Sequence, residues 1–285
     1  MKASMKILVT GAGGYLGRGI TSQLIDMGVE VVATDISVKG IDNRAKCIQG
    51  DIFSLDDPYD YFDCPDSVLH LAWRNGFVHN ADSHLNDLPL HFAFLKKLID
   101  SGVHRVSVMG TMHEVGFHEG PIKADTPCFP MNAYGISKNA LRQLLFSYAR
   151  TIDVELQWLR AFYIVNNDPA GSSVFSKVAK AALLGKKSFP FNSGMNQYDF
   201  LDYDLFCRYV ASAVIKDHAD GIINICSGFP QRLSDRMNRF ILENQFNIQL
   251  DYGAFPDRPY DSKAIWGDSA YLEQIMGSDF KRWRS

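Results

Sequence analysis

The sequence lacks the features that would place the chain in a membrane or on a nucleic acid. No apolar run approaches the roughly twenty residues that span a bilayer, and neither a secretory signal nor a lipidation motif is visible. The 29 Lys and Arg residues are balanced by 32 Asp and Glu, and no basic cluster marks a nucleic-acid or membrane surface. We therefore expect a cytoplasmic protein that binds neither nucleic acid nor membrane.

Cysteine is scarce, and the candidate metal ligands do not have the spacing of a known zinc motif. The 5 cysteines of the 285 residues show no C-x-x-C spacing, which is typical of reduced thiols rather than of disulfides or a zinc site. His113, Glu114 and His118 are spaced H-E-x-x-x-H rather than H-E-x-x-H, and Gly116 interrupts the helix that a zinc protease needs. We expect no metal site.

Glycine is concentrated near the N-terminus, between an apolar run at residues 6–9 and a stretch with helical apolar spacing at 15–27. A strand, a glycine turn and a helix in this order form a phosphate cradle, since glycine lets the backbone approach a pyrophosphate and the helix N-terminus offers free N–H groups. Asp35 ends the next apolar run, about where an acid would bind a ribose 2′-hydroxyl. We therefore expect NAD rather than NADP, although Lys39 lies nearby.

The alternation of apolar strands and amphipathic helices continues to about residue 160 and predicts a doubly wound parallel sheet. We expect an α/β fold of the Rossmann type with a smaller C-terminal α/β substrate lobe. The predicted NAD-binding domain covers residues 1–165 with a return segment at about 200–227, and residues 166–199 and 228–285 form the substrate-binding lobe.

Tyr134 and Lys138 lie four residues apart at the head of the helix predicted over residues 132–151, on one helix face. An ammonium group near a phenol favours the phenolate and lowers its pKa toward neutral pH. Tyr134 could then transfer a proton to or from a substrate oxygen while a hydride moves at the adjoining carbon.

The glycine motif Thr10-Gly11-x-x-Gly14-x-x-Gly17 and the later Y-x-x-x-K pair resemble the extended short-chain dehydrogenase/reductase superfamily. The resemblance is to its NAD-dependent epimerase/dehydratase branch, which acts on nucleotide sugars, and it covers about residues 5–160. It implies that Thr111 supplies the catalytic hydroxyl beside Tyr134 and Lys138. The residues that it places at the cofactor NAD are Gly11, Gly14, Tyr15, Leu16, Gly17, Asp35, Asp51, Ile52, Leu71, Ala72, Tyr134 and Lys138. Asp51 could equally be a turn residue.

Departures from the family pattern make the substrate less certain than the cofactor. Gly110 stands where a serine is usual, Val115 replaces a tyrosine, and Tyr198 replaces an arginine that grips the diphosphate in relatives. The expected substrate residues are Trp73, His113, Tyr163 and Arg258, of which His113 could instead pack its loop and Arg258 could be a surface residue.

We expect an NAD-dependent oxidoreductase or epimerase that transfers a hydride at a sugar ring carbon, most plausibly C4 of a nucleotide-activated sugar. One alternative is a uronate-type sugar-acid dehydrogenase, because Thr111, His113 and Gly116-Phe117 resemble the pattern of such enzymes. An alternative of another class is a non-catalytic NAD-binding sensor or scaffold, against which the retention of Thr111, Tyr134 and Lys138 counts. The oligomeric state is open, with a homodimer through the tyrosine-bearing helix as one possibility.

Overall fold

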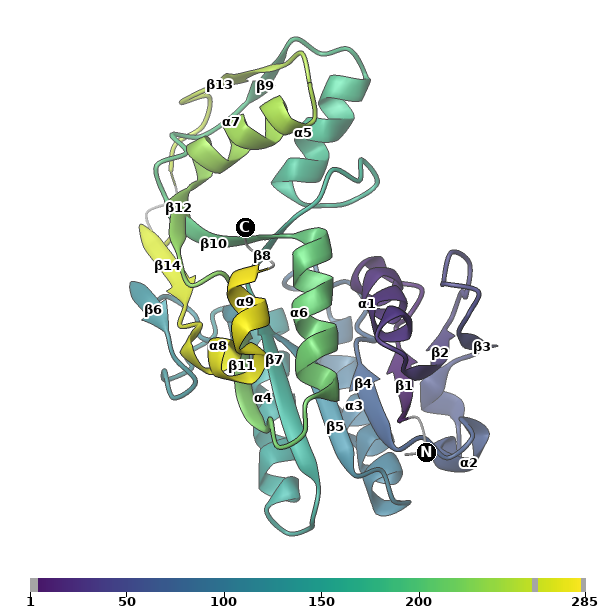
Figure 1. The fold of residues 1–285 in the computed structure, drawn as a ribbon. Helices are drawn as coiled ribbons and strands as arrows, with labels where there is room; N and C mark the ends of the chain where they lie inside the picture. Colours follow the sequence, from purple (N-terminus) through teal and green to yellow (C-terminus); the bar gives the residue numbers. More distant parts are fainter. Residues whose placement is uncertain (1–4, 258–260, 283–285) are drawn as a thin grey trace.

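A computed structural model describes residues 5–257 and 261–282 of the chain and shows a large parallel sheet with a smaller lobe above it (Figure 1). The sheet has 7 strands in the order β11-β7-β5-β4-β1-β2-β3, and every neighbouring pair is parallel. Its strands are β1 (Lys6–Thr10), β2 (Glu30–Asp35), β3 (Lys46–Gln49), β4 (Ser67–His70), β5 (Arg105–Thr111), β7 (Glu155–Ala161) and β11 (Gly221–Ile225). The reversal of strand order beside β1 places a binding crevice at the carboxyl ends of β1 and β4.

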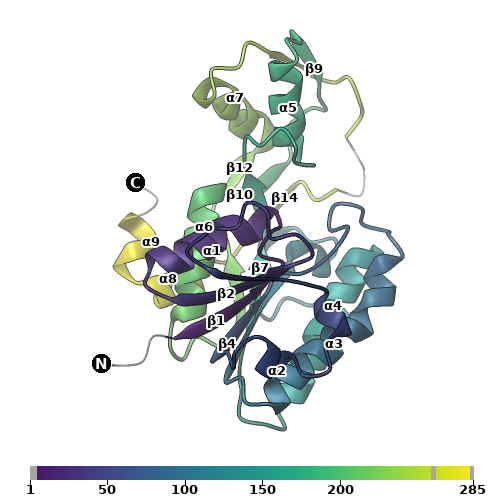
Figure 2. The same cartoon turned by 90° about the vertical axis from the view of Figure 1, so that its right-hand side faces the viewer.

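Helices cover both faces of this sheet, as the prediction of a doubly wound fold requires (Figure 2). One face carries α1 (Tyr15–Asp26), α6 (Tyr203–Ile215), α8 (Ala270–Met276) and α9 (Ser278–Arg282), whose apolar residues share one core cluster with β1 and β2. The other face carries α2 (Pro58–Tyr61), α3 (Ser83–Asp100) and α4 (Ala133–Ala149), which enclose a second cluster around Leu8, Val68 and Trp158.

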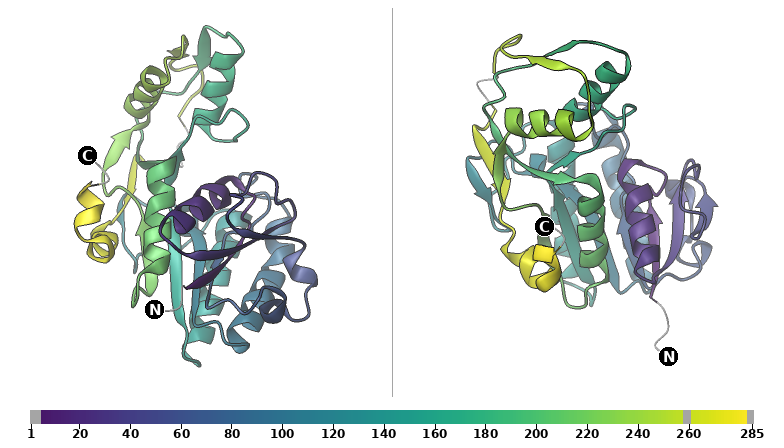
Figure 3. Two further views of the ribbon diagram at one scale, coloured as in Figure 1. Left: turned by 45° about the vertical axis from the view of Figure 1, so that its right-hand side comes forward. Right: turned by 45° about the horizontal axis from the view of Figure 1, so that its top comes forward.

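The smaller lobe lies beyond the carboxyl edge of the large sheet (Figure 3). Its elements are β8 (Tyr163–Val165), α5 (Val174–Leu183), β9 (Ser188–Pro190), β10 (Gln197–Asp202), β12 (Pro230–Arg232), α7 (Leu233–Glu243), β13 (Gln249–Asp251) and β14 (Ala264–Gly267). A sheet of order β12-β10-β14-β6 links it to β6 (Gly120–Ile122), and β8 pairs with β10. The lobe has its own core around Phe175, Phe200 and Phe240.

The main strands and helices lie within a few residues of the predicted bounds, and β11 returns to the large sheet beside β7. The connection between β5 and α4 contains a short 3-10 helix, η2 (Met112–Glu114), and the strand β6. One feature differs from the expectation. The helices α8 and α9, which we expected in the substrate lobe, pack on the large domain, because Leu272, Ile275 and Phe280 are buried in the cluster formed by α1 and α6.

Candidate active site

The glycine turn between β1 and α1 packs so closely against neighbouring backbone that side chains have no room there. Gly11 has a φ of +70°, and a Cβ added to it would lie 2.5 Å from the backbone nitrogen of Ala72. A Cβ at Gly17 would lie 2.2 Å from the carbonyl oxygen of Gly11. Gly14 is the N-cap residue of α1, so the free amides of the helix begin at this turn. These residues form the close backbone approach that a dinucleotide pyrophosphate requires.

Asp35 lies beside the turn, at the carboxyl end of β2. Its Oδ2 accepts a hydrogen bond from the backbone N–H of Gly13 at 3.0 Å. Asp51 lies in the next loop along the same edge, where its side chain caps the 3-10 helix η1 (Ile52–Ser54) by accepting from the N–H of Phe53 at 3.0 Å. Asp51 therefore has the turn-capping role that we considered, in a position at the same sheet edge as Asp35.

The remaining predicted cofactor residues surround this crevice. Leu71 follows β4 and donates its N–H to the carbonyl of Thr10 at 3.1 Å, which holds the end of β4 against the glycine turn. Ile52 is buried, and Leu16 packs against the core of the α1 face. Tyr15 is hydrogen-bonded to Asn166 of the smaller lobe, and burial raises the pKa of its phenol. The tight glycine turn at the N-terminus of α1 and the Asp35 carboxylate beside it fit an NAD cofactor.

Thr111 and Tyr134, expected to act together, lie close enough for the Thr111 hydroxyl to influence the pKa of the phenol. Thr111 ends β5 and Tyr134 lies in the first turn of α4, so the sheet edge and the helix N-terminus meet there. Burial raises the pKa of Tyr134 to about 12, an effect that the Thr111 hydroxyl opposes. In the protein without cofactor the phenol is therefore protonated at neutral pH.

Lys138 lies one helical turn further along α4 and is 2 % exposed. Its ammonium group donates to the carbonyl of Met109 at 2.8 Å and lies 3.9 Å from the ring centre of Trp73. Burial lowers the pKa of Lys138 to about 7, whereas the negative charge of Glu114 raises it. The structure thus brings Trp73, expected at the substrate, against Lys138.

The loop between β4 and α3 fixes the beginning of α4. The N–H of Tyr134 donates to the carbonyl of His79 at 2.8 Å, and the N–H of Ala133 donates to Oδ1 of Asn80 at 3.2 Å. Asn132, the N-cap residue, accepts from the N–H of Gly135 at 2.9 Å. Three amides that a helix N-terminus leaves without intrahelical partners are therefore satisfied, and Tyr134 is held firmly.

Histidine rings that we did not single out surround Tyr134. The ring of His79 stacks on that of Tyr134 with centroids 5.8 Å apart, and it lies 4.5 Å from the ring of His113. The ring of His84 is 5.3 Å from Tyr134. Burial lowers the pKa of His113 to about 4 and also lowers that of His79, so both imidazoles are neutral at pH 7. The sequence signal that could have located His79 is the polar composition of the segment after β4.

A chain of rings extends behind this site. The indole N–H of Trp73 donates to Nδ1 of His84 at 3.0 Å, so Nε2 of His84 must carry the proton that binds the carbonyl of Val78 at 2.9 Å. On its other side Trp73 stacks on His91 at 4.4 Å. His70 on β4 is buried and links Thr10 to His91.

The other substrate candidates are not part of this cluster. Tyr163 lies on β8, where its ring packs against Tyr198 at 4.5 Å, and burial raises the pKa of its phenol. Arg258 lies outside the described residues. The absence of a side chain at Gly110 has a local cause, because a Cβ there would lie 2.1 Å from Nε1 of Trp158.

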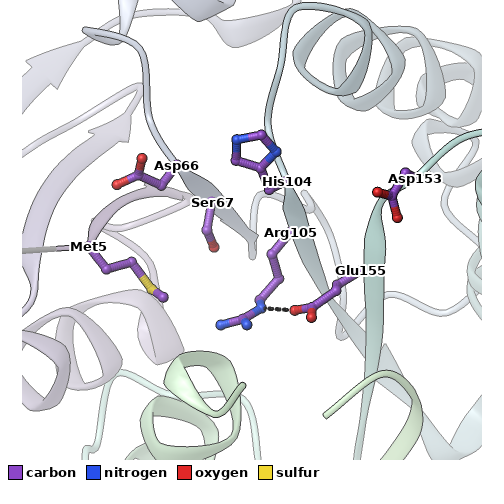
Figure 4. A pocket seen from close by; sticks show the side chains of 7 residues that line it. All are labelled: Met5, Asp66, Ser67, His104, Arg105, Asp153 and Glu155. Carbon is purple, nitrogen blue, oxygen red and sulfur yellow. Dashed lines mark hydrogen bonds and ion pairs between the residues drawn. The ribbon is translucent and has the colours of Figure 1, made fainter. Parts of the chain in front are cut away.

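A hollow of about 330 Å³ lies at the opposite, amino edge of the large sheet (Figure 4). Arg105 at the start of β5 lines it and donates from Nε to Oε2 of Glu155 at 2.6 Å. Because the glycine turn and Thr111 lie at the carboxyl ends of the strands, this hollow is separate from the candidate active site.

Within residues 5–257 and 261–282, no three His, Cys, Asp or Glu side chains are grouped so that they could hold a metal ion. In the same part of the chain, no helix is both long enough and apolar enough to cross a membrane.

Comparisons with known proteins extend over nearly the whole chain. The chain is 41% identical over 269 residues to dTDP-6-deoxy-L-talose 4-dehydrogenase (NAD(+)) of Aggregatibacter actinomycetemcomitans, covering 92% of this chain and 99% of the relative. It is 29% identical over 246 residues to UDP-glucose 4-epimerase of Azospirillum brasilense, covering 79% and 70% of the two chains. The crystal structure of UDP-glucose 4-epimerase from Thermotoga maritima has the same fold, with a TM-score of 0.80 at 22% identity over 95% of this chain and 92% of that one.

Residues 7–226 match the model of the NAD dependent epimerase/dehydratase family. These matches confirm the resemblance, the fold class and the NAD cofactor predicted from the sequence, and the chain is an enzyme that belongs to the NAD dependent epimerase/dehydratase family.

Proposed function

We propose that this enzyme exchanges a hydride between NAD and C4 of a nucleotide-activated sugar, with Tyr134 as the acid/base. The observation that carries the proposal is the position of Thr111 at the end of β5 and of Tyr134 in the first turn of α4, one turn before the buried Lys138, at the sheet edge that bears the glycine turn. A hydride step needs a group that moves the hydroxyl proton, and this arrangement supplies one.

Each of the three residues has a distinct role in this proposal. In the oxidising direction, the Tyr134 phenolate takes the proton of the sugar hydroxyl as the C4–H hydride leaves and the carbon–oxygen double bond forms. The Thr111 hydroxyl can both donate and accept, so it holds the reacting oxygen in the alcohol and in the ketone. Lys138, once protonated, lowers the pKa of the phenol from its raised value.

The glycine turn and Asp35 are the proposed binding site for the cofactor. When bound, NAD supplies the hydride acceptor, or the donor in its reduced form, and its oxidised ring adds a positive charge near the phenol. Gly11, Gly14 and Gly17 admit the pyrophosphate, and the Asp35 carboxylate accepts from the ribose hydroxyls and repels a 2′-phosphate.

The proposed substrate is a dTDP-linked 6-deoxyhexose. The support for this choice is that a dehydrogenase named for such a sugar is 41% identical to this chain and matches 92% of it. His113 is the proposed sugar contact, since its neutral ring lies 6.1 Å from the ring of Tyr134. Trp73 is assigned to hold Lys138 rather than to bind sugar directly, and Tyr163 and Arg258 remain candidates from the sequence.

A panel of dTDP and UDP sugars with NAD, followed by absorbance of NADH and by product analysis, tests this assignment. A 4-dehydrogenase produces one NADH per ketone, whereas a 4-epimerase, the activity of the 29% identical relative, inverts the centre without net NADH. Oxidation of free uronates alone would refute the nucleotide-sugar assignment. Failure of every sugar to react despite tight NAD binding would favour the sensor or scaffold.

Tyr134→Phe tests the residue roles on whichever substrate the panel returns. Removal of a general acid/base should lower turnover about 10²- to 10⁴-fold while NAD binding is retained. The matched control is Tyr148→Phe, which removes a hydroxyl from the far end of the same helix, where that hydroxyl bonds Asp100. Equal turnover in the two variants would exclude Tyr134 as the acid/base.

A further inference from the structure

A fully buried ion pair joins the short helix η2 to strand β7. Glu114 and Arg160 have no exposed surface, and Nε of Arg160 donates to Oε1 of Glu114 at 2.5 Å. The indole N–H of Trp158 also lies within bonding distance of both carboxylate oxygens, at 2.8 and 3.0 Å. Charges buried this deeply are costly unless they are paired and hydrogen-bonded, and such a pair does not by itself stabilise a fold. Its position therefore needs an explanation other than stability.

Glu114 ends the turn that carries two of the site's side chains. Thr111 is the N-cap residue of η2 and His113 lies within it, so the three residues belong to one rigid turn. The carbonyl oxygen of His113 lies so close to α4 that a Cβ on Gly135 would come within 2.4 Å of it. A small rotation of η2 would thus move Thr111 and His113 relative to Tyr134.

Arg160 connects the ion pair to the smaller lobe. Its Nη1 donates to the carbonyl of Lys123 at 3.1 Å and to Oδ1 of Asn224 at 3.4 Å. Asn224 in turn donates to the carbonyls of Ile122 at 2.7 Å and Asp268 at 3.2 Å. These bonds connect η2 and β7 of the catalytic domain to the ends of β6 and β14.

We propose that Glu114 is a positioning residue, which locks η2 onto β7 so that Thr111 and His113 face Tyr134. The inference rests on the proposed function, because it takes Tyr134 as the acid/base. The network also has an electrostatic effect, since the negative charge of Glu114 raises the pKa of both Tyr134 and Lys138. A merely structural residue could lower activity without moving the pH at which the phenol titrates.

Glu114→Gln is the first test, because it keeps the size of the side chain and removes its charge. We expect kcat to fall at least tenfold while the KM for NAD stays within twofold, since Asp35 and the glycine turn are unchanged. The pH at half-maximal oxidation rate should also move to lower values. His79, His84, His113 and Lys138, the titratable groups that surround Tyr134, remain in place, so this shift would report the lost charge of Glu114.

The matched control is Glu155→Gln. Glu155 lies on the same strand β7 and forms the same type of ion pair with a buried arginine, Arg105, but at the opposite edge of the sheet (Figure 4). It should leave kcat and the pH profile unchanged. A Glu114→Gln enzyme with the kcat and pH profile of the control would overturn the proposal.

A double variant separates positioning from folding. Glu114→Met with Arg160→Met replaces the pair by apolar side chains of similar size, so the protein should fold without an unpaired buried charge. We expect kcat to stay at least tenfold low, and hydrogen exchange of the amides at residues 111–115 to be faster than in the parent. Parent-like kcat and exchange would show that the pair serves folding alone.

The exchange measurement keeps this test independent of the proposed function. If Tyr134→Phe retained full turnover, the acid/base assignment would fail, whereas unchanged exchange in the double variant would refute the anchoring of η2. If the double variant did not fold, Trp158→Phe would replace it, because it removes only the neutral donor to Glu114. That variant should show the same faster exchange at residues 111–115 with a smaller loss of kcat, and parent-like exchange would count against the anchor.

Discussion

A side chain at position 110 is expected to lower the free energy of unfolding, although a serine is usual at this position in the superfamily that the sequence resembles. A Cβ at Gly110 would lie 2.1 Å from Nε1 of Trp158, a distance that real contacts do not reach. Trp158 has no exposed surface and its N–H is bonded to Glu114, so the indole has little freedom to move aside. Gly110→Ala should therefore strain the end of β5 immediately before Thr111.

The size of the effect follows from core overpacking, which costs about 1–3 kcal/mol of unfolding free energy. For a chain of this length, each kcal/mol lowers Tm by about 2–4 °C. Trp158→Phe alone should also destabilise, by about 1–3 kcal/mol, since the Glu114 carboxylate loses a donor. In the double variant the indole atom nearest to the new Cβ is gone and the smaller ring leaves more room, so the two losses should add only in part.

Chemical denaturation of the parent, both single variants and the double variant measures this coupling. The double variant should be at least about 1 kcal/mol more stable than the sum of the single effects predicts, the range seen for residues in contact. Additivity within about 0.5 kcal/mol would mean that Gly110 and Trp158 act independently, and the steric explanation of this glycine would fail.

Four further outcomes are expected. Asp35→Asn should weaken NAD binding and reduce the preference over NADP in fluorescence titrations, and tighter binding of NADP by the parent would mean that Asp35 is misplaced. Lys138→Met should lower both turnover and NAD affinity, and an unchanged affinity would count against a cofactor contact. Burial lowers the pKa of His91 to about 3 from its ordinary value near 6.5, so between these values only the unfolded chain binds this proton. The free energy of unfolding should therefore decrease as the pH is lowered, by up to about 1.4 kcal/mol per pH unit. Urea melts of His91→Gln from pH 4 to 7 should show a smaller decrease, and an unchanged slope would exclude His91 as its cause. Arg258→Ala should raise the KM for a nucleotide sugar at least tenfold, about 1.4 kcal/mol, with little change in kcat, and an unchanged KM would favour a substrate without a diphosphate.

The elements of the large sheet could be predicted because their signals are local. A short apolar strand, a glycine turn and a helix with apolar periodicity are all contained in about twenty residues, and the turn needs glycine at Gly11 for its backbone conformation. The placement of α8 could not be predicted in this way. Its apolar residues Leu272 and Ile275 indicate a helix, but only the tertiary structure shows that they pack on the α1 face of the large sheet.

The surroundings of Tyr134 depended on contacts between distant segments. The motif located Tyr134 and Lys138, but the carbonyl of His79 that caps the helix belongs to a loop more than fifty residues earlier. No sequence periodicity reports a backbone bond of this kind. The pairing of Trp73 with Lys138 was missed for the same reason, and we expected the indole at the substrate instead.

The departure from the family pattern at Gly110 has a structural consequence. Because position 110 has no Cβ, the indole of Trp158 fills the space beside it. That indole and Arg160 then hold the Glu114 carboxylate, three residues beyond Thr111. The turn that carries Thr111 is thus bonded to β7 through a buried carboxylate. If this bonding positions Thr111, as we propose, then Gly110 contributes to the site through the indole that it makes room for.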